Sequence, residues 1–114
     1  MKKSGKTTLD FKQRRKINKK RAVKWNKGVP SSLDFSMMEL AGECGEACNA
    51  AKKLSRLQKG WVGGLDTTEN LIEELADVVI CVDLIAMQMD IDLSKAVASK
   101  FNATSKKFGF EERL

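Results

Sequence analysis

The chain has 114 residues and a formal net charge of +6, with an ordinary share of hydrophobic residues for a globular protein. This length predicts one domain with a modest core that oligomerisation would supplement, and no apolar run approaches the length of a membrane span. The absence of histidine excludes histidine triads, histidine general bases and histidine-ligated zinc.

Basic residues are concentrated at the N-terminus. Residues 1–28 hold twelve Lys or Arg and one Asp, a net of +11, whereas the remaining residues hold nine basic and fourteen acidic side chains, a net of −5. We therefore divide the chain into a basic N-terminal arm or helix, residues 1–28, and a domain, residues 29–114. A helix is predicted over residues 9–25, with Thr7 or Thr8 as its cap.

The second predicted helix is long and is followed by a flexible loop. It runs from about Asp34 to about Leu57 and can be capped by Ser31, Ser32 or Asp34. The glycine-rich stretch "KGWVGGLD" then predicts a loop. This loop can close over a bound substrate or simply connect two helices.

Two further helices complete the predicted architecture. One begins after "DTTE", with Asp66 or Thr67 as the cap, and ends near Asp90. The other runs from about Asp92 to Gly109. No stretch alternates with a period of two for long enough to form a strand. The fold class is therefore all-α, with antiparallel neighbours joined by short loops.

The second helix carries an acidic stripe. At 100° per residue, Glu39, Glu43 and Glu46 fall within about 80° of one another, together with Ala50 and Lys53. Apolar residues gather on roughly the opposite side. Taken alone, this pattern is typical of an amphipathic helix whose acidic face is solvated.

The third helix is apolar nearly all round between Leu75 and Met87, which predicts that it is buried. Yet Glu73, Glu74, Asp77 and Cys81 lie along one strip of it, and we expect Asp77 within the packed region. An unpaired buried carboxylate costs several kcal/mol. Either a Lys or Arg from another helix compensates it, or a divalent cation is shared with the second helix.

Two short acidic motifs favour the cation. The sequence "ECGE" contains Glu43 and Glu46, and "EELAD" contains Glu74 and Asp77. Acids at i and i+3 on two helices can present several oxygen ligands to one ion, and oxygen ligands suit Mg²⁺, or Mn²⁺ as an alternative. One E-x-x-E is common, but its combination with a second cassette inside an apolar helix is much more specific.

These residues resemble a known family. The stretches "ELAGECGEACNAAKKL", "EELADVVICVDLIA" and "IDLSKAVASKFNATSKKFG" are similar to the MazG-like all-α nucleoside triphosphate pyrophosphohydrolases, over about residues 33–109. A small stand-alone domain of this kind is similar to phage and bacterial versions. The resemblance implies a bundle of four to five helices completed by oligomerisation, as a homodimer or homotetramer. The basic arm is not part of the family pattern.

The resemblance also implies an activity. It is the Mg²⁺-dependent hydrolysis of a nucleoside or deoxynucleoside triphosphate to the monophosphate and pyrophosphate, by attack of metal-activated water at the α-phosphorus. Carried over residue by residue, the metal ligands would be Glu43, Glu46, Glu74 and Asp77. Without histidine, a carboxylate must orient or deprotonate the water. We expect Glu43 or Glu46 in that role.

The remaining candidates would bind the substrate. Lys53 and Lys100, with Arg56 near Lys53, can bind phosphates, although each can equally be a solvated surface charge. Asn102 can hydrogen-bond a base or sugar, and Trp25 or Trp61 can stack on a base or simply pack.

Two rival functions need no hydrolysis. The arm "KQRRKINKKRAVK" can neutralise nucleic-acid phosphates, or it can be a solvated or disordered segment. In a helical assembly protein, the acids would pair with the arm of a neighbouring subunit. In every case three cysteines without scaffold spacing, and no recognisable secretory signal, lead us to expect a reduced cytoplasmic protein.

Overall fold

The computed structural model describes residues 10–64 and 67–114 and contains helices but no strand within those ranges. The all-α prediction is confirmed. The helices, in chain order, are α1 (Phe11–Trp25), α2 (Leu33–Gln58), α3 (Thr68–Gln88) and α4 (Leu93–Phe108). In this described part, no helix is long and apolar enough to cross a membrane.

Each helix begins at a polar N-cap whose side chain accepts a backbone N–H three residues on. The caps are Asp10, Ser32, Thr67 and Asp92. The cap predicted for α1 was wrong, because Asp10 fills this position with a bond of 2.7 Å from the Gln13 N–H. Thr7 and Thr8, the candidates for that cap, and Asp66, a candidate for the cap of α3, lie outside the described residues.

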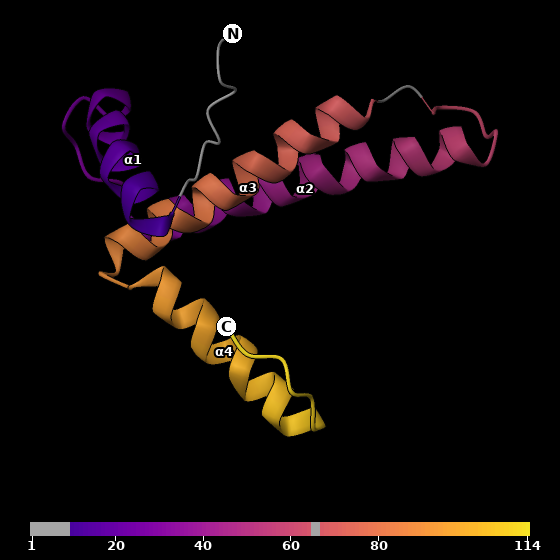
Figure 1. Ribbon diagram of the computed structural model, residues 1–114. Coiled ribbons are helices and arrows are strands. Elements are labelled where there is room, and N and C mark those ends of the chain that lie inside the picture. Colours follow the sequence, from indigo (N-terminus) through magenta and orange to yellow (C-terminus); the bar gives the residue numbers. More distant parts are fainter. Residues whose placement is uncertain (1–9, 65–66) are drawn as a thin grey trace, which may run out of the picture.

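Helices α2 and α3 form an antiparallel pair, and the loop between them turns tightly at the end of α2 (Figure 1). A methyl group added at Gly64 would lie 2.5 Å from the backbone nitrogen of Leu57. Only glycine therefore fits where this loop passes over α2. The close fit fixes the point at which the chain reverses direction.

The face of α2 that packs on α3 lies between the acidic stripe and the predicted apolar side. It includes Ala50, which belongs to the acidic stripe and is 2% exposed, and Ala47, which belongs to the apolar side and is also buried. Met37 and Cys48, from the predicted apolar side, are exposed. The acidic stripe therefore borders the helix interface, and the interpretation of it as a fully solvated face was wrong.

We expected Asp77 to be the buried carboxylate of α3, but the buried one is Asp83. Asp83 is completely buried and Asp77 is exposed. The side-chain amide of Asn18 donates to Asp83 at 3.1 Å, and the Arg15 Nε lies 3.6 Å from the other carboxylate oxygen. These contacts compensate the charge and fix how α1 sits on the C-terminal half of α3.

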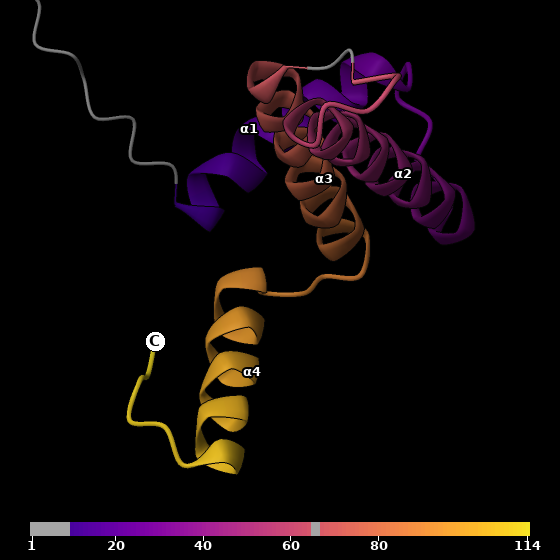
Figure 2. The same ribbon diagram turned by 90° about the vertical axis from the view of Figure 1, so that its right-hand side faces the viewer.

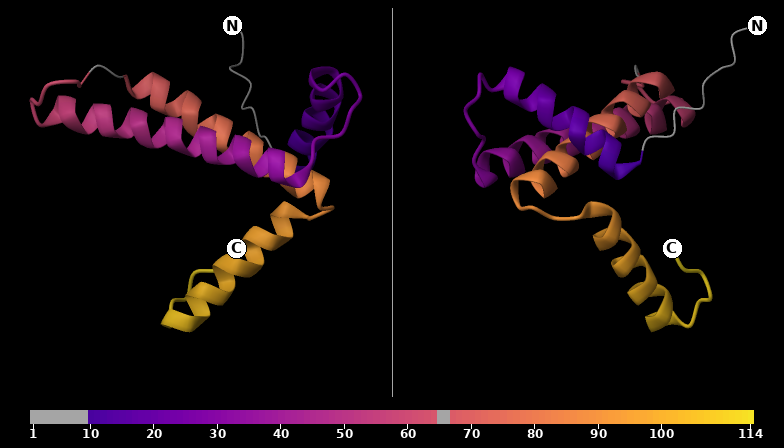
Figure 3. Two further views of the ribbon diagram at one scale, coloured as in Figure 1. Left: turned by 180° about the vertical axis from the view of Figure 1, so that it is seen from behind. Right: turned by 60° about the vertical axis from the view of Figure 1, so that its left-hand side comes forward.

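Helix α4 leaves the α2–α3 pair at an angle and projects away from it, as Figures 2 and 3 show from three further directions. One side of α4 carries Val97, Phe101 and Phe108, which are spaced by four and seven residues and are all exposed. The protomer therefore carries an apolar helical face that its own chain leaves open.

We predict that Asp83→Ala destabilises the protein by about 3 kcal/mol, because Arg15 and Asn18 lose the buried carboxylate that they share. Urea unfolding measures this change. The exposed acid Glu73 on the same helix supplies the control, since Glu73→Ala should change the free energy of unfolding by no more than about 0.5 kcal/mol. Equal, small effects of both substitutions would contradict the proposed contribution of Asp83.

Candidate metal centre

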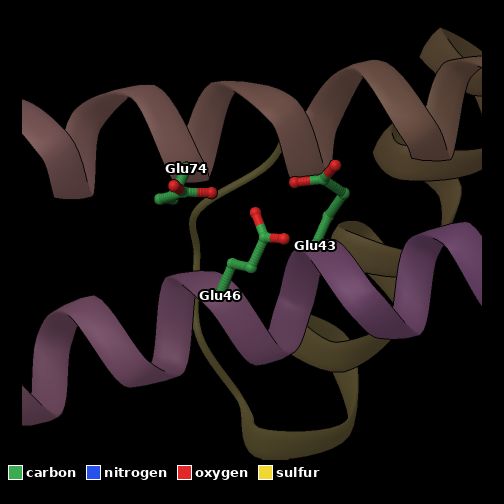
Figure 4. A group of neighbouring side chains, drawn as sticks. All are labelled: Glu43, Glu46 and Glu74. Atoms are coloured by element: carbon green, nitrogen blue, oxygen red, sulfur yellow. The ribbon is translucent and has the colours of Figure 1, made fainter.

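Three glutamates converge where α2 faces α3. Glu43 and Glu46 come from successive turns of α2 and Glu74 comes from α3, and one oxygen from each lies within 4.8 Å of the others. Figure 4 shows Glu46 between the other two, with all three side chains in the space between the helices. The small side chains of Ala47 and Ala50 allow the two helices to approach closely at this point.

Two oxygens of this cluster are shut away from water. Glu43 Oε2 and Glu74 Oε2 are buried, and neither has a hydrogen-bond partner among the described residues. Within the described ranges, Arg15 forms an ion pair with Asp83, and no basic residue forms one with any of the three glutamates. Among the described residues, neutralisation by Lys or Arg, the alternative kept open from the sequence, therefore applies to Asp83 but not to the three glutamates.

The pKa values of two of the three glutamates are raised. Partial burial, followed by the negative charges of Glu46 and Asp77, raises the pKa of Glu43 above its ordinary value. For Glu74 the pKa is raised by partial burial first and then by contact with the Glu46 carboxylate. Both shifts therefore reflect burial first and the mutual repulsion of neighbouring carboxylates second.

The donor set fits a hard divalent cation. All three donors are carboxylates, which Mg²⁺ and Mn²⁺ prefer, and the buried oxygens have no competing partner. Glu46 is exposed while Glu43 and Glu74 are half-buried. The cluster is therefore open on one side, where water or a phosphate oxygen can complete a coordination shell.

The fourth predicted ligand, Asp77, does not belong to this group of three. Its exposed carboxylate nevertheless lies near enough to raise the pKa of both Glu43 and Glu74. Its role as a ligand stays a prediction.

A cavity of about 540 Å³ adjoins the cluster and is enclosed by α1, α2, α3 and the segment before α2. Glu43 and Asp77 line its acidic end. Trp25, which is 82% exposed, contributes to the wall formed by α1. Among the predicted substrate-binding residues, the structure thus places Trp25 in one cavity with the acids.

Sequence reasoning missed Gln88 and Asn18 in this cavity. Asp77, Cys81, Leu84 and Gln88 recur at i, i+4, i+7 and i+11 and all line it. That helical spacing was visible in the sequence and could have identified Gln88. Asn18 had no comparable signal, since its place depends on how α1 docks on α3.

The predicted phosphate-binding residues lie apart from the three glutamates. Lys53 and Arg56 are half-buried further along α2, and Arg56 lies against Gly63 in the loop. Lys100 is exposed on the projecting α4. The Asn102 side chain donates to the Leu114 carbonyl at 3.2 Å and accepts from the Leu114 N–H at 2.8 Å. Their roles stay predictions.

Comparison with known proteins gives one match, to a family model. The model of the MazG nucleotide pyrophosphohydrolase domain matches residues 32–108, which is more than half of the chain. No curated protein and no solved structure matches the chain. The matched segment contains the three glutamates and Asp77, and it begins after α1.

We predict that in metal-free protein Glu43→Gln raises the melting temperature at pH 7. Below the ordinary glutamate pKa of 4.5, this residue is protonated in both the folded and the unfolded chain. As the pH rises, the unfolded chain ionises first, so the raised pKa of Glu43 makes ionisation destabilise the fold. The stabilisation by the substitution should therefore disappear near pH 4.

The same melting experiment tests metal binding. Mg²⁺ at 100 times its Kd should stabilise the parent protein by about 2.7 kcal/mol, whereas Glu43→Gln should lose most of this gain. Glu73→Gln, an exposed acid on α3 outside the cluster, should behave as the parent does. If Mg²⁺ left the melting temperature of the parent protein unchanged, the proposed metal centre would be contradicted.

Proposed function

The chain belongs to the MazG nucleotide pyrophosphohydrolase domain family, and we propose that it hydrolyses a nucleoside or deoxynucleoside triphosphate to the monophosphate and pyrophosphate. The observation that carries this proposal is the pair of buried, unpartnered oxygens of Glu43 and Glu74. Such oxygens are costly unless a cation binds them. A cation at this place would also attract a triphosphate into a site that is otherwise acidic.

We propose Mg²⁺, or Mn²⁺, held by Glu43, Glu46 and Glu74, with Asp77 as a further ligand or as a ligand to a bound water. When bound, the ion supplies Lewis-acid activation of water and neutralises phosphate charge. Glu43 and Glu74 are half-buried and suit the ligand role. Glu46 is exposed and lies between them, so it is the better candidate to orient the water and accept its proton.

The cavity beside the cluster is the proposed nucleoside site. Its acidic end, at Glu43 and Asp77, would receive the α-phosphate, while Trp25 would stack on the base. The volume of about 540 Å³ lies within the range of small-molecule sites. Lys53 and Arg56 continue α2 beyond Glu46 and would steady the outer phosphates.

We further propose that a second copy of the chain completes the site. Apolar side chains of α2 and α4 are exposed in the protomer, with Met37 at 47% and Phe108 at 62%. Covering them with the same faces of a second copy would form a homodimer, or a homotetramer through further contacts. Since α4 projects away from its own cluster, Lys100 and Asn102 would then serve the partner's cluster.

The three free cysteines and a nucleotide substrate support a reducing, cytoplasmic setting for this activity. Cys81 lines the cavity, and burial followed by the charge of Glu43 raises the pKa of its thiol. In the metal-free protein the raised pKa keeps this thiol protonated at neutral pH.

We predict that pyrophosphate is released from one or more nucleoside triphosphates in Mg²⁺ and that EDTA abolishes the release. Glu46→Gln should lower kcat by at least about 100-fold, the contribution expected of a general base. Asp77→Asn should also lower turnover. Glu73→Gln is the matched control, and full turnover in Glu46→Gln and Asp77→Asn would contradict the assigned site.

A mixing experiment tests whether each site draws on two copies. Glu46→Gln and Lys100→Ala should each be nearly inactive alone. Co-expressed in equal amounts, they should recover about a quarter of the parent activity, because half of the dimers are mixed and each mixed dimer holds one intact site. No recovery in mixed dimers isolated with two tags would place Lys100 in its own protomer's site, and full activity of Lys100→Ala alone would show that Lys100 serves no site.

A further inference from the structure

Helix α1 presents two different faces. One face docks on α3 through the buried Asn18 and through Arg15, which meet Asp83. The other carries Lys12, Lys16, Lys20 and Lys24 at every fourth position, and all four are exposed. We call these four residues the lysine stripe. At 100° per residue they fall within about 120° of one another.

The rotation of α1 is set by contacts on its docked face and not by the lysines. Asn18 donates to Asp83 Oδ2 at 3.1 Å and to the Ile80 carbonyl at 3.4 Å. Turning the helix would break both bonds inside a buried contact. The lysine stripe is therefore held toward solvent, and none of its members lines the cavity beside the metal centre.

The lysine stripe has no counter-charge in the protomer. Helix α1 contains no acidic residue, and over residues 10–64 and 67–114 no ion pair involves the four lysines. Like charges at i and i+4 destabilise a helix by about 0.2–0.5 kcal/mol per pair. Three such pairs follow one another along α1, so the helix gains stability when an external polyanion binds.

We propose that the lysine stripe is a docking surface for duplex DNA and that it binds the duplex without sequence preference. The stripe from Lys12 to Lys24 extends about 18 Å along the helix axis. A helix of this kind enters or flanks the major groove of B-form DNA, about 12 Å wide, and meets phosphates on both sides. Lysine neutralises phosphates but, without Asn, Gln or Arg in the stripe, supplies little base readout.

The composition of the stripe argues for duplex DNA over other polyanions. Single-stranded nucleic acid is usually held by aromatic stacking as well as charge, and no aromatic residue belongs to the stripe. The major groove of A-form RNA is too deep and narrow for a helix. Insertion into a membrane surface needs a free apolar face opposite the lysines, whereas that side of α1 includes Arg15 and Asn18, which hold it against α3.

The test measures binding of the full chain to a fluorescently labelled 20-base-pair duplex by anisotropy, at several salt concentrations between 50 and 200 mM. Neutralising four phosphates predicts a slope of about −3.6 in log K against log salt, or about 150-fold weaker binding across this range. The variant Lys12→Gln, Lys16→Gln, Lys20→Gln, Lys24→Gln should lose this slope and at least about tenfold in affinity at the lower salt.

A matched control changes four exposed lysines elsewhere to Gln, namely Lys52, Lys95, Lys106 and Lys107. Both variants have the same net charge, so loss of binding in the stripe variant alone supports the proposal. Equal loss in both variants, or tighter stripe-dependent binding to single-stranded DNA, duplex RNA, phosphatidylglycerol vesicles or polyglutamate, would overturn it. Circular dichroism checks that both variants keep their helices. Retained pyrophosphate release would separate the stripe from the metal centre.

Discussion

The repulsion between carboxylates enclosed by α2 and α3 is the constraint on which the rest of the structure depends. Glu43 and Glu74 each place one oxygen out of reach of water and of any hydrogen-bond donor. Alanines on α2 bring the helices close enough for this to happen. A packing arrangement that concentrates negative charge in this way is unfavourable by itself, and it becomes favourable when a divalent cation occupies the space between the side chains.

The same arrangement explains why the protomer is open. The apolar residues that are fully buried in its described part are Ala47, Ala50, Cys81 and Ala86, all of them small. Larger apolar side chains of α2 remain exposed because α2 packs on α3 through the border of its acidic stripe, and those of α4 remain exposed because α4 projects away from the pair. We infer that a second copy supplies the missing core. Metal binding and assembly would then stabilise one another, since both act on the orientation of α2.

Much of the fold followed from the sequence. Helical periodicity, capping residues and the glycine loop placed all four helices within a few residues of their observed ends, and the spacing of Glu43, Glu46 and Glu74 identified the acidic cluster. The periodicity of a single helix does not say which neighbour covers which face. For this reason the packing face of α2 was predicted only in part, and the exposure of Asp77 was predicted wrongly.

The contact that buries Asp83 shows the same limit most clearly. Asn18 and Asp83 are 65 residues apart in the chain, and neither belongs to a motif that would pair them. Their contact depends on the docking of α1, a helix whose sequence is dominated by solvated lysines and arginines. The polar residues of the cavity wall follow from that docking too, so they could not be derived from local patterns.

The most direct test of the central claim is an anomalous-scattering measurement on crystals of the parent protein grown with Mn²⁺. The account predicts an anomalous peak between α2 and α3, bounded by carboxylate oxygens of Glu43, Glu46 and Glu74. A map without a peak there, with lysine or arginine side chains neutralising the three glutamates instead, would contradict it.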